Sequence, residues 1–151
     1  MITASALSLC IFTAAQTYSV PVNVLLGIMT VEGGYPGLAM TNKNKTQDLG
    51  PMQVNTIWLP ELAKHWGVSK RTALRLVRDD ACINIGVAAW ILRTKINQSG
   101  SLYKGIAWYH SATPHLGQKY RDKVLKAMGR YRNVIRPSDV IVSYNKTKPK
   151  N

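Results

Sequence analysis

The sequence predicts a mainly α-helical fold with one small β-hairpin region. Apolar residues recur at helical spacing through most of the 151 residues. Residues 34–57 break this pattern, because they are rich in Gly, Pro, Asn and Thr and contain short β-prone pieces. With 46% hydrophobic residues, a chain of this length can bury one core, which excludes a disordered or fibrous protein.

The first predicted helix lies near the N-terminus. An apolar stripe starts at Leu7 and continues at helical spacing to Tyr18. Residues 6–15 also resemble the core of a signal peptide, but no Lys or Arg precedes them, as an export signal requires. Polar residues interrupt the run within 16–23, before it reaches the roughly 20 apolar residues of a membrane span. We therefore expect a buried helix and see no export signal in this sequence.

A second helix is expected from Pro21, which suits a first turn, to Gly33-Gly34, which suits a helix end. Glu32 is the only charged residue among the first 42 and shares a face with the apolar residues three, four and seven positions earlier. Burial and the negative end of the helix dipole predict a raised pKa for Glu32, as a general acid needs. A Glu32 that bends into solvent or pairs with a distant Arg is the alternative.

Further helices are expected after the hairpin region. The predicted helical ranges are 59–66, 70–78, 81–97 and 114–132, with a short segment at 102–109. Asp79 or Asp80 is the expected N-cap of the helix at 81–97. From Pro137 the chain is polar, so we expect a domain over 1–135 and a basic C-terminal tail over 136–151, mobile at 146–150.

Asp48 is the second carboxylate of interest. It lies beside Gly50 in a hairpin-like context, where a turn residue that bonds its own backbone is the ordinary interpretation. Together with Glu32, 16 residues earlier, it indicates glycosidic-bond chemistry. One carboxylic acid protonates the bridging oxygen, while a second carboxylate stabilises the cationic transition state. The other acids suit solvated or capping positions; they are Glu61, Asp79, Asp80, Asp122 and Asp139.

Three motifs, in this order, resemble the soluble lytic transglycosylase family. They are Glu32-Gly33, the run Thr46–Asn55 with its Asp-Leu-Gly-Pro-Met-Gln-Val-Asn, and Trp108-Tyr109-His110-Ser111. Residues 79–92 are also similar, so that the resemblance covers roughly 8–131. It is strongest to the specialised wall-opening enzymes of conjugation, type IV and type III secretion systems. The resemblance implies a lysozyme-like fold with a helical lobe and a small β-hairpin lobe on either side of a cleft.

The resemblance also implies an activity. Such enzymes cleave the bond between N-acetylmuramic acid and N-acetylglucosamine in peptidoglycan without water and need no cofactor. Glu32 matches the catalytic glutamate, which protonates the glycosidic oxygen and then deprotonates the muramyl 6-hydroxyl to close a 1,6-anhydro ring. The residues expected to shape the cleft and position the glycan are Gly50, Met52, Gln53, Asn55, Tyr109 and His110.

Three positions depart from the family pattern. Gly33 replaces a Ser, Pro51 replaces a Leu and His110 replaces an Asn. An orienting hydroxyl is therefore absent, one turn is stiffer, and the cleft gains an imidazole with different hydrogen bonding from an amide. Asp48 resembles the second carboxylate of animal lysozymes, so a lysozyme-type hydrolase that uses Glu32 and Asp48 is an alternative. A structural role for Asp48 in the hairpin is equally open.

The two cysteines have two interpretations. From the residues alone, Cys10 and Cys82 could be two inert buried thiols. The related secretion-system enzymes carry one Cys before the first conserved helix and one in an Asp-x-Cys segment. The resemblance therefore implies a Cys10–Cys82 disulfide and an oxidising compartment such as the periplasm.

The formal net charge of +13 favours a polyanionic partner. Anionic peptidoglycan strands fit this charge, and so does nucleic acid, although no base-reading motif is present. A nucleic-acid-binding or scaffold module of a secretion system is thus the alternative from another class. We expect a monomer that acts on peptidoglycan glycan strands and meets subunits of a secretion or conjugation machine. No metal is expected, because the three His and two Cys show no ligand spacing.

Overall fold

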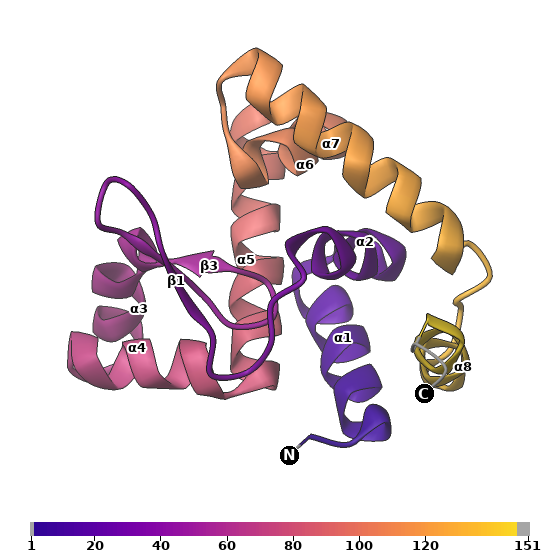
Figure 1. The fold of residues 1–151 in the computed structure, drawn as a ribbon, viewed down its shortest axis with the longest axis horizontal. Coiled ribbons are helices and arrows are strands. Elements are labelled where there is room, and N and C mark those ends of the chain that lie inside the picture. Colours follow the sequence, from indigo (N-terminus) through magenta and orange to yellow (C-terminus); the bar gives the residue numbers. More distant parts are fainter. Residues whose placement is uncertain (1, 148–151) are drawn as a thin grey trace.

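The computed structural model describes residues 2–147, and Figure 1 shows their arrangement. In chain order the elements are α1 (Ala4–Tyr18), α2 (Val22–Glu32), β1 (Ala39–Thr41), β2 (Gln47–Leu49), β3 (Val54–Asn55), the 3-10 helix η1 (Thr56–Trp58), α3 (Leu59–Trp66), α4 (Lys70–Asp79), α5 (Ala81–Ser99), α6 (Leu102–His110), α7 (Pro114–Met128), the 3-10 helix η2 (Gly129–Tyr131) and α8 (Pro137–Thr147). The prediction of a mainly α-helical fold with a small β region is confirmed.

Helix α5 forms the centre of the molecule. Its side chains are buried on several sides, as expected for a helix that other helices surround. Helices α1, α4 and α6 pack against it, and Figure 1 shows the β-strands with α3 and α4 on one side and α1 with α2 on the other. The side chain of Asp80 accepts a hydrogen bond from the Ile83 N–H, so Asp80 is the N-cap of α5.

The three strands form one antiparallel sheet in the order β1-β2-β3. Asp48 lies on the central strand, opposite Met40 of β1 and Asn55 of β3. Its neighbour Leu49 is fully buried in the core. Because successive side chains of a strand point to opposite faces, burial of Leu49 turns Asp48 away from the core.

Helix α2 ends at Glu32, as its sequence predicts. Gly33 adopts a left-handed conformation with φ 64°, and its N–H donates to the Met29 carbonyl to close the helix. A side chain at this position would be strained, so this backbone conformation favours the Gly that stands here. Helix α7 packs against α2, and this contact brings the second half of the chain to Glu32.

The C-terminal region differs from the expected polar tail. Residues 137–147 form α8, which packs against α1 through the buried Val140. The Asp139 carboxylate accepts hydrogen bonds from the Ile135 and Arg136 N–H groups, which stabilises the start of this helix. Of the segment expected to be mobile, residues 148–150 lie outside the described range. The division of the chain at residue 135 stays a prediction.

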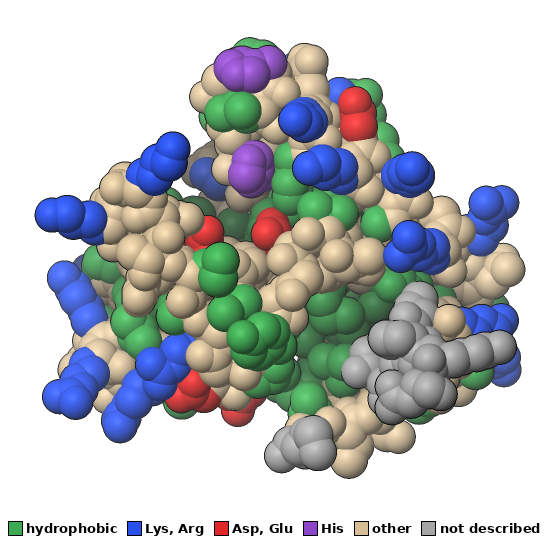
Figure 2. Space-filling view, viewed as in Figure 1, with side chains coloured by type: hydrophobic (Ala, Val, Ile, Leu, Met, Phe, Trp, Pro, Cys, Tyr) green, Lys and Arg blue, Asp and Glu red, His purple; other side chains and the backbone are tan. Residues whose placement is uncertain are grey.

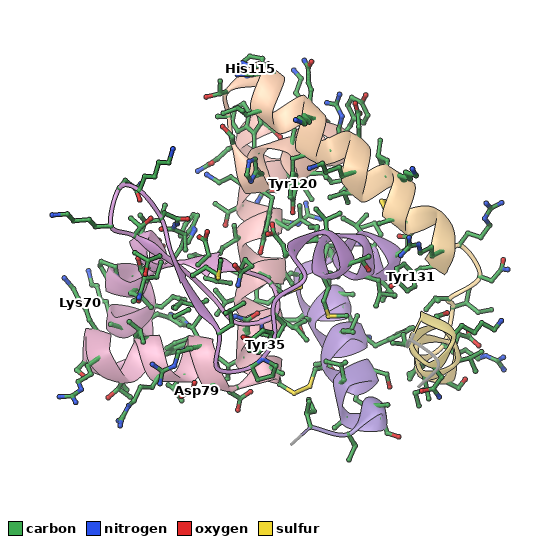
Figure 3. The ribbon with its side chains drawn as sticks, in the orientation of Figure 1. Tyr35, Lys70, Asp79, His115, Tyr120 and Tyr131 are labelled. Atoms are coloured by element: carbon green, nitrogen blue, oxygen red, sulfur yellow. A yellow bond between two sulfur atoms is a disulfide. The ribbon has the colours of Figure 1, made fainter. Side chains whose placement is uncertain are left out.

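A disulfide joins α1 to the start of α5. It links Cys10 and Cys82, whose Cα atoms lie 5.1 Å apart, and Figure 3 shows it as a yellow bond. The pairing that the family resemblance implies is therefore present in the structure. Within residues 2–147, no helix is long and apolar enough to cross a membrane.

Candidate active site

A cleft of about 650 Å³ separates the β lobe, here residues 34–58, from the helices α5 and α6. Figure 2 shows a hollow in this region with acidic side chains and a histidine at its edge. The β lobe supplies Asn42, Lys43, Asn44, Thr46, Asp48, Gln53, Val54, Asn55, Ile57 and Trp58, and the helical side supplies Glu32, Ile91, Lys95, Trp108, Tyr109, His110, Ser111 and Ala112. Both carboxylates that the sequence singles out thus line one cleft.

Glu32 is held by a tyrosine from a distant helix. The hydroxyl of Tyr120 on α7 donates a hydrogen bond of 2.9 Å to Glu32 Oε1. Figure 3 shows Tyr120 between α7 and α2. Burial and the nearby charge of Glu32 raise the pKa of Tyr120 above its ordinary value, so the hydroxyl keeps its proton and remains a donor.

The pKa of Glu32 is raised from 4.5 to about 7. The main cause is burial, which disfavours the charged carboxylate; the hydrogen bond from Tyr120 opposes this rise, and the charge of Asp48 adds to it. A carboxyl group with this pKa is about half protonated at neutral pH. It can therefore donate a proton and later accept one, as general acid and base catalysis requires.

Two aromatic rings stack near the ring of Tyr120. The rings of His110 and Tyr120 are stacked with centroids 4.8 Å apart, and Tyr109 lies on the same cluster with its centroid 6.4 Å from that of Tyr120. The Tyr109 hydroxyl donates to the Met52 carbonyl at 2.9 Å. This bond joins the end of α6 to the turn after β2, so two of the three sequence motifs are in direct contact.

Asp48 is held by a hydrogen bond across the sheet. The side-chain amide of Asn55 donates to Asp48 Oδ1 at 2.9 Å and to the Thr46 hydroxyl at 3.0 Å. The side-chain Oδ1 of Asn55 in turn accepts the Ile57 N–H and caps η1. Asn55 therefore fixes the orientation of Asp48 in the cleft.

The turn after β2 has a strained backbone that a buried asparagine holds. Gly50 and Gln53 both adopt positive φ, and Gln53 donates its side-chain amide to the Gly50 carbonyl. Asn84 on α5, which is fully buried, accepts the Met52 N–H at 2.8 Å and donates to the carbonyls of Leu49 and Val77. A Cβ on Gly50 would collide with Asn84, which explains the glycine.

The predicted glycan-positioning residues divide into two groups. Gln53, Asn55, Tyr109 and His110 line the cleft, whereas Gly50 and Met52 lie behind its wall, with Met52 only 1% exposed. Two residues were missed by the sequence reasoning. Asn84 lies within the segment 79–92 that resembles the family, but its role depends on contacts 32 and 35 residues away. Tyr120 has no sequence signal beyond its place in a predicted helix.

A second hollow of about 940 Å³ lies between α3, α4, α5 and the end of α1. Its lining contains one carboxylate, that of Glu61, so this hollow does not offer a carboxylate pair. Among residues 2–147, no group of three or more His, Cys, Asp and Glu side chains could hold a metal ion. The cleft with Glu32 and Asp48 is therefore the candidate active site.

Comparison with known proteins identifies the family of this chain. The family model of the transglycosylase SLT domain matches residues 9–148. This match covers most of the chain, so the chain belongs to the transglycosylase SLT family, and its mainly α fold is the lysozyme-like fold of that family. Family membership supports lytic transglycosylase activity on peptidoglycan. A search of curated proteins finds no match to this chain.

Proposed function

We propose that this protein is a lytic transglycosylase that cleaves the β-1,4 bond between N-acetylmuramic acid and N-acetylglucosamine. Glu32 protonates the glycosidic oxygen, and the resulting carboxylate then removes the proton of the muramyl 6-hydroxyl, which attacks the anomeric carbon and forms 1,6-anhydromuramic acid. The observation that carries this proposal is a carboxyl group with a pKa near 7, placed in a cleft and held by the Tyr120 hydroxyl. No cofactor takes part in these steps.

Replacement of the acid tests this role. We expect Glu32→Gln to lower peptidoglycan cleavage by about a thousandfold, because the amide keeps the shape but cannot transfer the proton. Cleavage is measured as release of soluble muropeptides from purified sacculi. Glu61→Gln, an exposed carboxylate on α3, is the matched control and should cleave like wild type. A folded Glu32→Gln variant with wild-type activity would refute the assignment.

Asp48 is proposed to stabilise the positive charge that develops on the sugar ring. Its place in the same cleft, fixed by Asn55, supports this role and also favours lysozyme-type hydrolysis as the second candidate function. Asp48→Asn retains Oδ1 as the acceptor for Asn55 and removes only the charge. We expect kcat to fall roughly 10- to 100-fold, and unchanged kinetics would make Asp48 a structural residue.

We further propose that the enzyme acts as a monomer in the periplasm, where it opens the wall for a secretion, conjugation or pilus machine. The Cys10–Cys82 disulfide supports an oxidising compartment, and the resemblance of the motifs to specialised wall-opening enzymes supports the machine. In fractionated host cells, the protein should be found in the periplasm with both cysteines resistant to thiol labelling. Recovery of a reduced protein in the cytoplasm would contradict this location.

A further inference from the structure

Two lysines line the cleft, one from each of its walls. Lys43 lies in the turn between β1 and β2, and Lys95 lies on α5. They face a cleft whose lining contains two acids, Asp48 and the partly protonated Glu32. Basic side chains in an acid catalyst's cleft need an explanation, because they play no part in the proton transfers proposed above.

Lys95 is positioned by an aromatic ring. Its ammonium lies 5.4 Å from the centroid of the Trp58 ring, which itself packs edge-on against Trp90 with centroids 5.3 Å apart. Its hydrogen-bond partner is the neutral Gln98, at 3.4 Å. The half-buried lysine stem is thus held in place while the charge stays available at the cleft surface.

Neither ammonium has an anionic partner in the described part of the chain. The ion pairs found in residues 2–147 join Arg78 to Asp79, Arg121 to Asp122 and Arg136 to Asp139. Lys43 is exposed and Lys95 is half-buried, so each wall contributes one positive charge to the lining of the space that the glycan would fill. Such charges attract an anion carried by the ligand, and they do so more strongly in a partly enclosed cleft than on an open surface.

We propose that Lys43 and Lys95 bind carboxylates carried by the muramyl residue and make the enzyme selective for anionic glycan strands. Every muramyl residue has a lactyl group at its C3 oxygen, which ends in a carboxylate or continues into a carboxylate-bearing stem peptide. Unsubstituted N-acetylglucosamine has no such charge. The inference rests on the proposed function, since it names the part of the peptidoglycan substrate that the cleft recognises.

The experiment measures dissociation constants of soluble peptidoglycan fragments for Lys43→Gln and Lys95→Gln. Both are made in the Glu32→Gln background, so that fragments are not consumed. Each substitution should weaken binding about fivefold at low salt, and both together about 25-fold. Lys95→Arg, which keeps the charge, should bind nearly like the Lys95 parent. Lys45→Gln, on the same turn but outside the cleft lining, removes the same charge and should leave binding unchanged.

Three forms of the fragments identify the anion. In one form the carboxylates are blocked as neutral amides, in the second an amidase has removed the stem peptides and left the lactyl carboxylate, and the third is intact. Blocked fragments should bind the Lys43→Gln/Lys95→Gln variant and its parent equally. In intact fragments the lactyl carboxylate is condensed into the amide that begins the stem peptide, so a lysine effect there reports carboxylates of the stem peptide. If amidase-treated fragments retain the effect, the lysines also bind the free lactyl carboxylate; if they lose it, the stem peptide alone supplies the ligand.

Two results would overturn the inference. One is a lysine variant that binds intact fragments as tightly as its parent. The other is an equal loss of binding for intact and blocked fragments, which would indicate a loss of packing and not of charge recognition. The wild-type enzyme assayed in parallel separates this inference from the proposed function. Failure of wild type to release any muropeptide from sacculi would refute the function, whereas cleavage without a lysine effect would refute this inference alone.

Discussion

At the scale of single residues, burial of Glu32 and its hydrogen bond from Tyr120 together set the protonation of the proposed acid. Burial of Glu32 raises its pKa, and the Tyr120 hydroxyl limits this rise because it stabilises the carboxylate form. Without that donor, a proton would be held too tightly for efficient transfer to the glycosidic oxygen. Tyr120 is therefore a positioning residue that acts through Glu32.

The variant Tyr120→Phe tests whether the Tyr120 hydroxyl lowers the pKa of Glu32. Activity needs a protonated Glu32, so kcat/KM of wild type should fall as the pH rises through about 7. In Tyr120→Phe the pKa of Glu32 rises further, so this fall should move to higher pH, while kcat at pH 6 should drop about tenfold because the acid is weaker and less well oriented.

Tyr131→Phe is the matched control for the pH profile. The Tyr131 hydroxyl bonds Thr30 on the same helix as Glu32, at 2.8 Å. Its removal eliminates a hydroxyl of the same kind without touching the carboxyl group. The pH profile should remain that of wild type. If the pH profile of Tyr120→Phe coincides with those of wild type and Tyr131→Phe, the hydrogen bond from Tyr120 has no role in the titration of Glu32.

At the scale of elements, Asn84 connects the central helix to the cleft. Its three hydrogen bonds join α5, the end of α4 and the turn after β2. Since the amide is fully buried, its loss would leave one N–H and two carbonyls without partners in the core. The turn with its positive φ angles depends on these bonds for its shape.

We expect Asn84→Ala to lower the free energy of unfolding by about 3 kcal/mol and to reduce kcat/KM as well, since Gln53 loses its support. Urea unfolding measures the first effect. Asn97→Ala, at an exposed position of the same helix, should change stability by less than about 1 kcal/mol. Equal stability of both variants would show that the buried amide network does not hold the turn.

The elements could be predicted from the sequence where local patterns decide them. Apolar stripes, Pro21 and Gly33 define α1 and α2, and the change to Gly- and Asn-rich composition marks the β lobe. Helix α8 was not predicted, because a polar segment gives little sign that Val140 will pack against α1. Its stability comes from tertiary contact, which a local pattern does not encode.

The candidate site was only partly accessible from sequence. Glu32 is identified because a lone acid on an apolar helix face is unusual on chemical grounds. Asp48 on its own is an ordinary turn residue, and it becomes a candidate only as the partner of Glu32 and as part of the motif that resembles the family. Tyr120 was missed because it lies 88 residues from Glu32 and approaches it only when α7 packs on α2. The sequence likewise does not show that Met52 is buried in the core while Gln53 lines the cleft, because this depends on the conformation of the turn.

At the scale of the whole molecule, the disulfide ties the first helix to the central one. It spans a sequence separation of 72 residues, so in the chain-entropy model it stabilises the fold by about 4 kcal/mol. We expect Cys10→Ala/Cys82→Ala to lose about this much in urea unfolding, and reduction of wild type to give a similar loss. Unfolding that is insensitive to a reducing agent would show that the bond does not stabilise the fold.

In the proposed reaction, Glu32 drives a lytic cleavage that adds no water to the product. Mass spectrometry of the muropeptides released from purified peptidoglycan tests it most directly, with wild type and Glu32→Gln side by side. We predict that wild type releases products ending in 1,6-anhydromuramic acid and that the variant releases none. Products ending in reducing muramic acid, heavier by one water molecule, would contradict the claim and identify a hydrolase with Asp48 as a full catalytic partner.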